Sequence, residues 1–65
     1  MNEIILEDIH GQQTKIKKPD TIFITLDLQT MTIDLSTKKD NKITLIHELS
    51  IDSLNEIINI YQEEL

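Results

Sequence analysis

Residues 21–36 read TIFITLDLQTMTIDLS, and this stretch decides the fold of the chain. Aliphatic residues occupy every second position in both halves of the stretch, which is the period of a β-strand with one apolar face. A tight turn at Gln29-Thr30 would set Leu26 opposite Ile33, so that the apolar faces of the two halves coincide. The stretch therefore predicts an antiparallel β-hairpin.

Two further strands are predicted before this hairpin. Residues 3–9 and 13–17 are rich in β-forming residues, and Gly11 between them tolerates the positive φ of a turn. A second turn is expected at residues 18–21, because Pro19 presets the φ angle that such a turn needs. The N-terminal third of the chain therefore predicts a hairpin that leads directly into the next one.

A fifth strand is predicted after the hairpin. Residues 37–42 are polar, and we expect a loop there in which Asn41 adopts the left-handed conformation. Residues 43–47 then resume the alternation of apolar and polar side chains. On this interpretation Ile43 and Leu45 share the apolar face of the preceding strands.

The period changes from two to between three and four in the last segment. Ser50 is a favourable N-cap, and Asp52 lies in the first turn, where the helix dipole favours an anion. We therefore predict a helix that begins at Ser50 or Ile51, with an apolar stripe that packs on the meander. The stripe consists of Ile51, Leu54, Ile57, Ile58, Tyr61 and Leu65.

These patterns together predict the fold class. We expect an α+β fold, in which an antiparallel β-meander of about five short strands is followed by one C-terminal amphipathic helix. A chain of 65 residues has room for one core only, so residues 1–65 are expected to form a single small domain.

Both faces of the predicted sheet are apolar. The first face is expected to form the core beneath the helix, and it comprises Ile4, Leu6, Ile22, Ile24, Leu26, Leu28, Met31, Ile33, Leu35, Ile43 and Leu45. The second face carries Ile5, Ile9, Ile16, Phe23 and Ile46. One helix cannot cover both faces, so either the meander closes into a small barrel around the second group or that group forms a docking surface. Because association often stabilises domains of this size, we favour the docking surface.

The composition argues against several functional classes. The chain has no cysteine and only one glycine, which excludes disulfides, thiolate metal ligands and a glycine-rich phosphate loop. His10 and His47 are too few for a metal site, and no nucleophile motif is present. We therefore expect no enzyme activity, no cofactor and no metal. No apolar run approaches the length of a membrane span and no signal peptide is apparent, so we expect a cytoplasmic protein without membrane contact.

Charge is distributed in two groups. On the helix, Asp52, Glu56 and Glu63 line one side, which is either an imitation of a phosphate row or, as we favour, a solvated face. The cations are all lysines, in two groups at residues 15–18 and 38–42. Their use in nucleic-acid binding is disfavoured by the net charge of −6 and by the absence of arginine.

The function predicted from these features is protein binding without catalysis. We expect a small acidic accessory or inhibitory protein that forms a homodimer and acts on a larger host protein. A phage or mobile-element origin is our hypothesis, because abundant isoleucine, lysine and asparagine without arginine or alanine is typical of an A+T-rich genome. The alternatives are a sheet-based nucleic-acid-binding protein that uses the lysine loops and a structural subunit of a larger assembly. The residues expected to contact the partner are Ile5, Ile16, Phe23, Ile46, Asp52, Glu56 and Glu63.

Overall fold

The computed structural model describes residues 3–62 and shows five antiparallel strands followed by one helix, which confirms the predicted α+β fold. Within these residues no helix is long and apolar enough to cross a membrane. The elements in chain order are β1 (Glu3–Glu7), β2 (Gln13–Lys17), β3 (Thr21–Asp27), β4 (Thr32–Lys39), β5 (Lys42–Ile46) and α1 (Ile51–Gln62).

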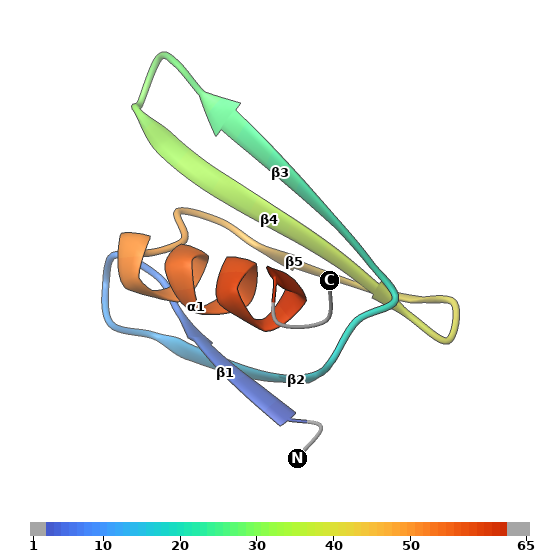
Figure 1. The fold of residues 1–65 in the computed structure, drawn as a ribbon. Coiled ribbons are helices and arrows are strands. Elements are labelled where there is room, and N and C mark those ends of the chain that lie inside the picture. The colour runs from blue at the N-terminus through green and yellow to red at the C-terminus, as the bar shows by residue number, and fades with distance from the viewer. Residues whose placement is uncertain (1–2, 63–65) are drawn as a thin grey trace.

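The strands form two sheets rather than one. The meander breaks between β2 and β3 at Pro19, so that β1 and β2 pair with each other while β3, β4 and β5 form a second sheet in that order. Figure 1 shows α1 between the two-stranded sheet and strands β5 and β4, with β3 at the far edge. The helix therefore has a sheet on two sides, an arrangement that the sequence analysis did not consider.

The start of α1 ties the two sheets together. Leu49 N donates a hydrogen bond to the Ile33 carbonyl of β4 at 2.7 Å, and Ser50 N donates to the Glu7 carbonyl of β1 at 2.9 Å. An isolated β-bridge between Asp8 and Leu49 lies at the same point. These bonds fix the helix entrance relative to both sheets.

The hairpin of β3 and β4 has the predicted register. Leu26 lies opposite Ile33, so the alternating aliphatic residues of the two strands share one face. The turn is held by the Asp27 carboxylate, whose Oδ1 accepts hydrogen bonds from Gln29 N at 2.9 Å and Thr30 N at 3.4 Å. A short acidic side chain at the end of a strand thus supplies partners for the backbone of the turn.

The predicted phase of β5 is wrong. Asp40 and Asn41 both have positive φ, of 50° and 66°, and they form a two-residue turn that pairs Lys39 with Lys42. Two residues with positive φ are the signature of a type I′ hairpin, which continues β4 further than a six-residue loop would. The register sets Ile46 opposite the buried Leu35 and Leu45 opposite Ser36, so Ile46 points into the core and Ile43 and Leu45 point outward.

The core lies between the two sheets and around the helix. Leu6, Leu35 and Ile57 are fully buried, and they come from β1, β4 and α1. The remaining buried apolar residues are Ile4, Ile46 and Leu49, and the half-buried ones packed against them are Ile16, Ile22, Leu54, Ile60 and Tyr61. The interior therefore combines residues that were predicted on both faces of the sheet, including Ile16 and Ile46.

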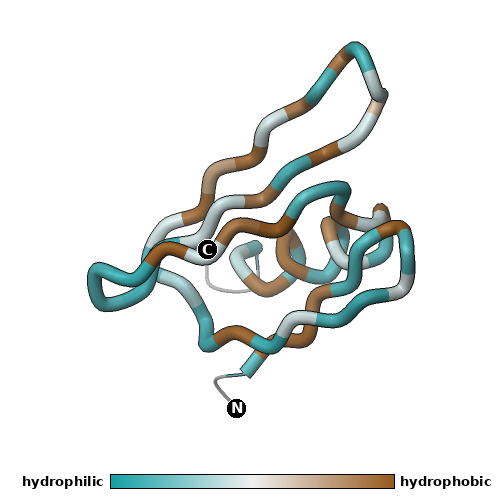
Figure 2. Tube along the Cα trace, turned by 180° about the vertical axis from the view of Figure 1, so that it is seen from behind, coloured by the Kyte–Doolittle hydropathy of each residue, from teal (hydrophilic) through white to brown (hydrophobic). Residues whose placement is uncertain are grey.

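The outer part of the β3–β4 hairpin projects beyond this core. Ile24, Leu26, Leu28 and Met31 were predicted as core residues, but all four are exposed. Figure 2 shows hydrophobic stretches that continue along this hairpin away from the helix, while the turn between β4 and β5 is hydrophilic. The physical reason is width, because a helix of about 10 Å covers roughly two strands spaced about 4.8 Å apart and leaves the third uncovered.

The helix begins at Ile51, as the sequence predicts. The Ser50 hydroxyl accepts a hydrogen bond from Ser53 N at 3.2 Å, which is the expected N-cap contact. Ser53 is itself buried, and its Oγ accepts a hydrogen bond from Glu7 N of β1 at 2.8 Å. Ile51 of the predicted stripe is exposed, and Leu65 lies outside the described residues.

The C-terminal part of α1 is anchored by Tyr61. Its hydroxyl donates a hydrogen bond to the Pro19 carbonyl between the sheets, and the Lys18 ammonium lies 5.6 Å from the centre of its ring. Burial, together with the nearby Asp20 carboxylate, raises the pKa of Tyr61 above its ordinary value of 10.0.

This shift predicts a pH dependence that can be observed directly, because Tyr61 is the only tyrosine and the chain has no tryptophan. We expect the phenolate absorption band of the folded protein to appear above pH 10.0. The free energy of unfolding should contain a contribution from the neutral phenol that is complete below pH 10.0 and disappears as the pH rises through the folded pKa. A Tyr61→Phe variant should lack this contribution. Titration of the phenol at its ordinary pKa in the native protein would contradict the prediction.

Candidate protein-interaction surface

An apolar patch occupies the outer face of the three-stranded sheet. The register places Phe23 of β3, Ser36 of β4 and Leu45 of β5 in one row across the sheet, with Ile43 two residues further along β5. We call Phe23, Ile43 and Leu45 the outer patch. Their exposed fractions are 61%, 67% and 54%, so no described element covers this face. The small Ser36 separates the two large side chains of this row.

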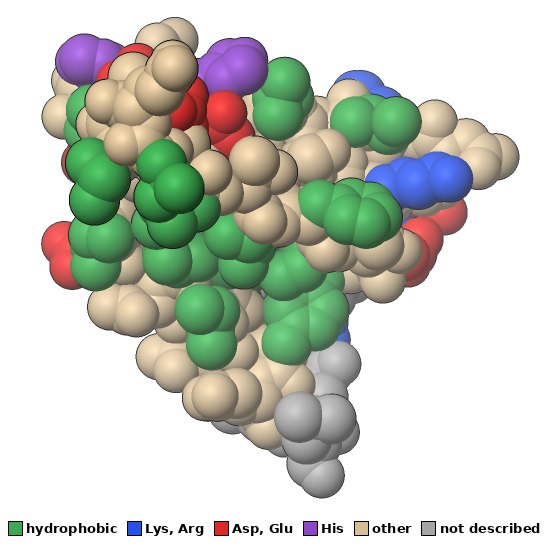
Figure 3. Space-filling model, turned by 90° about the horizontal axis from the view of Figure 1, so that it is seen from above, with side chains coloured by type: hydrophobic (Ala, Val, Ile, Leu, Met, Phe, Trp, Pro, Cys, Tyr) green, Lys and Arg blue, Asp and Glu red, His purple; other side chains and the backbone are tan. Residues whose placement is uncertain are grey.

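A second exposed apolar group lies on the projecting hairpin, with two residues on the face of β3 opposite Phe23 and two in the turn. We call Ile24, Leu26, Leu28 and Met31 the arm patch. Figure 3 shows hydrophobic side chains gathered in a band across the side of the molecule that carries the β3–β4 hairpin. Apolar side chains therefore emerge on both faces of β3, which is unusual for a strand that is not buried.

The structure separates the four apolar residues that were predicted to contact a partner. Ile5 and Phe23 are exposed as expected, but they lie on different sheets. Ile16 is half-buried against the core, and Ile46 is buried within it. The expected exposure of Ile46 is therefore wrong, because the two-residue turn after β4 directs it inward.

The acidic side of the helix is exposed. Asp52 and Glu56 lie on the surface of α1 and line a shallow pocket together with Ile5, Glu7 and Gln13. Glu63, which was predicted to continue the row, lies outside the described residues. Three carboxylates, those of Glu7, Asp52 and Glu56, thus lie around the pocket beside one exposed isoleucine, and this surface can contribute to binding.

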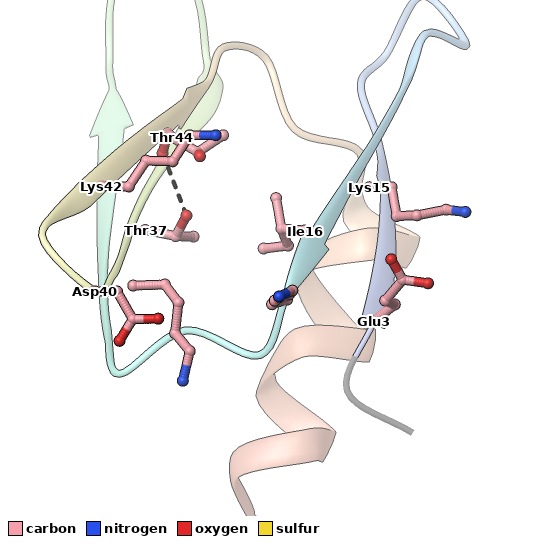
Figure 4. Close-up of a pocket in the computed structure, with 9 residues that line it drawn as sticks. Glu3, Lys15, Ile16, Thr37, Asp40, Lys42 and Thr44 are labelled. Carbon is pink, nitrogen blue, oxygen red and sulfur yellow. Dashed lines mark hydrogen bonds between the residues drawn. The ribbon is translucent and has the colours of Figure 1, made fainter.

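A pocket between the two sheets brings lysines from both groups together. It is lined by Lys15 and Lys17 of β2 and by Lys39 and Lys42 of the β4–β5 hairpin, together with Ile16, Thr37, Thr44 and the acidic Glu3 and Asp40. Figure 4 shows Ile16 directed toward Thr37, whose hydroxyl donates to the Thr44 carbonyl at 3.4 Å, and Lys15 extending away from the gap. The lysine side chains thus surround an opening that also contains acids, and they do not converge on one point.

The titratable groups do not form a metal centre in the part of the chain that is described. His10 Nε2 lies 3.4 Å from a Glu48 carboxylate oxygen, and His47 Nδ1 lies 3.5 Å from an oxygen of Asp34. Each is a single pair at the surface, and no group of three or more potential ligands occurs among residues 3–62.

Sequence reasoning missed two residues of the outer patch, Ile43 and Leu45, because it assigned them to the core. The signal that could have placed them correctly is the pair Asp40-Asn41, since both residue types tolerate the left-handed conformation that a two-residue hairpin turn requires. Recognition of that turn would have fixed the phase of β5.

Comparison of the chain with protein-family models, with curated proteins and with solved structures gave no match. The surface described above is therefore the basis on which a function can be argued.

Proposed function

We propose that this protein is a non-catalytic module that binds a larger protein through the outer patch. The observation that carries the proposal is the exposure of Phe23, Ile43 and Leu45 by more than half on one sheet face. Apolar side chains gathered on one exposed face are typical of interaction sites, and aromatic side chains such as Phe23 dominate the energetics of interfaces.

The charges around the patch indicate the character of the partner. Asp34 and Asp27 lie on the same face as Phe23 according to the strand register, and the chain carries a net charge of −6. A negative field steers association toward a basic surface. The partner site that fits is apolar at its centre and carries lysine or arginine at its rim. Binding there would act by occupying a surface of the partner, which is the accessory or inhibitory role inferred from the sequence.

Nucleic-acid binding receives less support from the arrangement. The lysine-lined pocket opens between the sheets, where Thr37 and Thr44 lie, whereas Phe23 lies on the opposite face of the same sheet. Binding of single strands combines cations and stacking aromatic rings on one surface. Here these two features face in different directions.

Binding assays with two matched variants test the proposal. The double variant Ile43→Ser/Leu45→Ser changes only exposed side chains of β5, and the control Ile51→Ser changes an exposed isoleucine at the start of α1. We expect the wild type and the control to retain the same protein from a lysate of the source organism. The double variant should bind that protein at least about tenfold more weakly, the equivalent of about 1.4 kcal/mol.

Two results would count against this function. Equal retention by the double variant would exclude the outer patch as the binding surface, provided that circular dichroism shows the variant to be folded. Tight, salt-sensitive binding of single-stranded or duplex oligonucleotides at low salt would instead favour the nucleic-acid alternative.

A further inference from the structure

Strand β3 forms an open edge of its sheet. It pairs only with β4, and residues 21–26 contain no charged residue, proline or glycine. Proteins ordinarily protect exposed edges with such residues, because an unpaired row of N–H and C=O groups accepts another strand. Strand β2, in contrast, carries Lys15 and Lys17. The edge of β3 is therefore built as a pairing surface rather than as a protected one.

The sheet register shows which backbone groups face this edge. In a two-residue hairpin the residues that flank the turn form a hydrogen-bonded pair, which applies to Lys39 and Lys42. Because hydrogen-bonded and non-hydrogen-bonded pairs alternate, odd-numbered residues of β4 bond to β5 and even-numbered residues bond to β3. The partners of the even-numbered residues in β3 are odd-numbered. The N–H and C=O groups of Ile22, Ile24 and Leu26 therefore point to the open edge.

We propose that β3 pairs with β3 of a second copy of this chain, antiparallel and about a two-fold axis at Ile24. In this register Ile24 lies opposite the partner's Ile24, and Ile22 lies opposite the partner's Leu26. All three residues whose backbone groups face the edge then form hydrogen-bonded pairs, with about six interchain bonds. The two three-stranded sheets become one continuous sheet.

The side chains of the two copies match in this register. Ile22, Ile24 and Leu26 share one face of β3, and they meet the same three residue types across the two-fold axis. On the other face Phe23 lies opposite the partner's Thr25 and beside Ser36 of β4. Its ring therefore has a small residue on each side. Aromatic residues beside β-branched ones form favourable cross-strand pairs.

The distribution of charge favours the antiparallel arrangement. Thr21, at one end of β3, pairs with Lys38, and the pocket at this end is lined by Lys17, Lys18 and Lys39 with Asp20 and Asp40. The lysines visible in Figure 3 all lie toward this end of the molecule. At the other end β3 finishes at Asp27. Antiparallel pairing sets the acidic end of each copy beside the lysine-bearing end of its partner, whereas parallel pairing would align like charges.

This pairing is independent of the proposed function, because it uses the edge of β3 and not the sheet face. The outer patches of the two copies would lie together on one face of the continuous sheet, where a partner protein can still reach them. The pairing also gives two residues of the arm patch a partner, because Ile24 lies opposite the partner's Ile24 and Leu26 lies opposite the partner's Ile22. An unrelated extended peptide could bind the same edge, but it would lack the two-fold match of side chains and charges.

The mass of the protein in solution tests the pairing without any partner protein. Light scattering over a dilution series should give a mass of twice 7.6 kDa at high concentration for the wild type. The variant Ile24→Lys should give 7.6 kDa throughout, because a lysine at the two-fold axis meets its own copy. A monomeric wild type, or a dimer that Ile24→Lys leaves intact, would overturn the proposal.

Disulfide trapping tests the register, because the chain has no cysteine of its own. In the proposed dimer the Cα atoms of the two Ile24 residues are about 5.5 Å apart, within the range of about 4.4 to 6.8 Å for a disulfide. The variant Ile24→Cys should therefore form a covalent dimer on mild oxidation. The control Leu26→Cys is on the same strand and face and is exposed by 56% against 46% for Ile24, but it would lie about 13 Å from its counterpart. Equal crosslinking of the two variants would overturn the proposed register.

Discussion

Replacing Ile46 by alanine is expected to lower the free energy of unfolding by about 3 kcal/mol, whereas Ile43→Ala should change it by about 1 kcal/mol or less. The two isoleucines lie three residues apart on β5, but Ile46 is 6% exposed and Ile43 is 67% exposed. Truncation of Ile46 leaves a cavity beside Leu35, which lies opposite it in the sheet. Truncation of Ile43 removes only surface contacts and some strand propensity.

Chemical denaturation of both variants measures this difference. A domain of this size has only a few kcal/mol of stability, so Ile46→Ala is expected to be partly unfolded in the absence of denaturant. Because the phase of β5 predicted in the sequence analysis has Ile43 in the core and Ile46 on the surface, the two variants discriminate between the two phases of β5. A larger loss for Ile43→Ala would show that the turn at Asp40 and Asn41 differs from a two-residue hairpin.

The phase of β5 illustrates where the sequence leaves the fold open. In β3 and β4 a single period of two covers both strands, and only one register buries the aliphatic residues together. In β5 the segment Ile43-Thr44-Leu45-Ile46 has apolar residues in both phases, so its pattern does not select a face. The length of the preceding turn makes that choice, and a one-residue difference exchanges the core and surface sides.

The sequence also does not show how far the core extends across the sheet. The pattern identifies Ile24 and Leu26 as members of an aliphatic face, and the register confirms it. It does not reveal that the helix lies over β4 and β5 and leaves β3 uncovered, since this depends on where α1 is tied to Ile33 and Glu7. The candidate site was therefore predicted only in part. Phe23 was expected on an exposed face, whereas Ile43 and Leu45 of the outer patch were expected in the core.

Replacing Ser53 by alanine is expected to lower the free energy of unfolding by about 2 kcal/mol. The buried Ser53 hydroxyl accepts a hydrogen bond from Glu7 N at 2.8 Å, and this bond joins α1 to β1 across 46 residues of sequence. Without the hydroxyl, the Glu7 N–H loses its partner in a poorly hydrated position, which costs roughly 1 to 3 kcal/mol. The higher helix propensity of alanine offsets only about 0.5 kcal/mol of this loss.

The matched control is Asn55→Ala, which makes a comparable change at an exposed position of the same helix. It should leave the stability unchanged or slightly raised, because Asn55 is exposed and alanine has the higher helix propensity. Thermal and denaturant unfolding of both variants provide the comparison. If Ser53→Ala proved as harmless as Asn55→Ala, the hydrogen bond to Glu7 would have no part in holding the helix to the first sheet.

The two-sided packing of α1 also sets the order in which the protein can be assembled during synthesis. Each hairpin closes over a few residues, but Leu6 of β1 is buried in the same core as Ile57 of α1, and Glu7 is bonded to Ser53. We therefore expect Leu6 to stay in water until the ribosome has delivered α1. A newly made chain that still lacks the helix has no interior to stabilise its hairpins, and we expect it to become resistant to proteases only when the helix arrives.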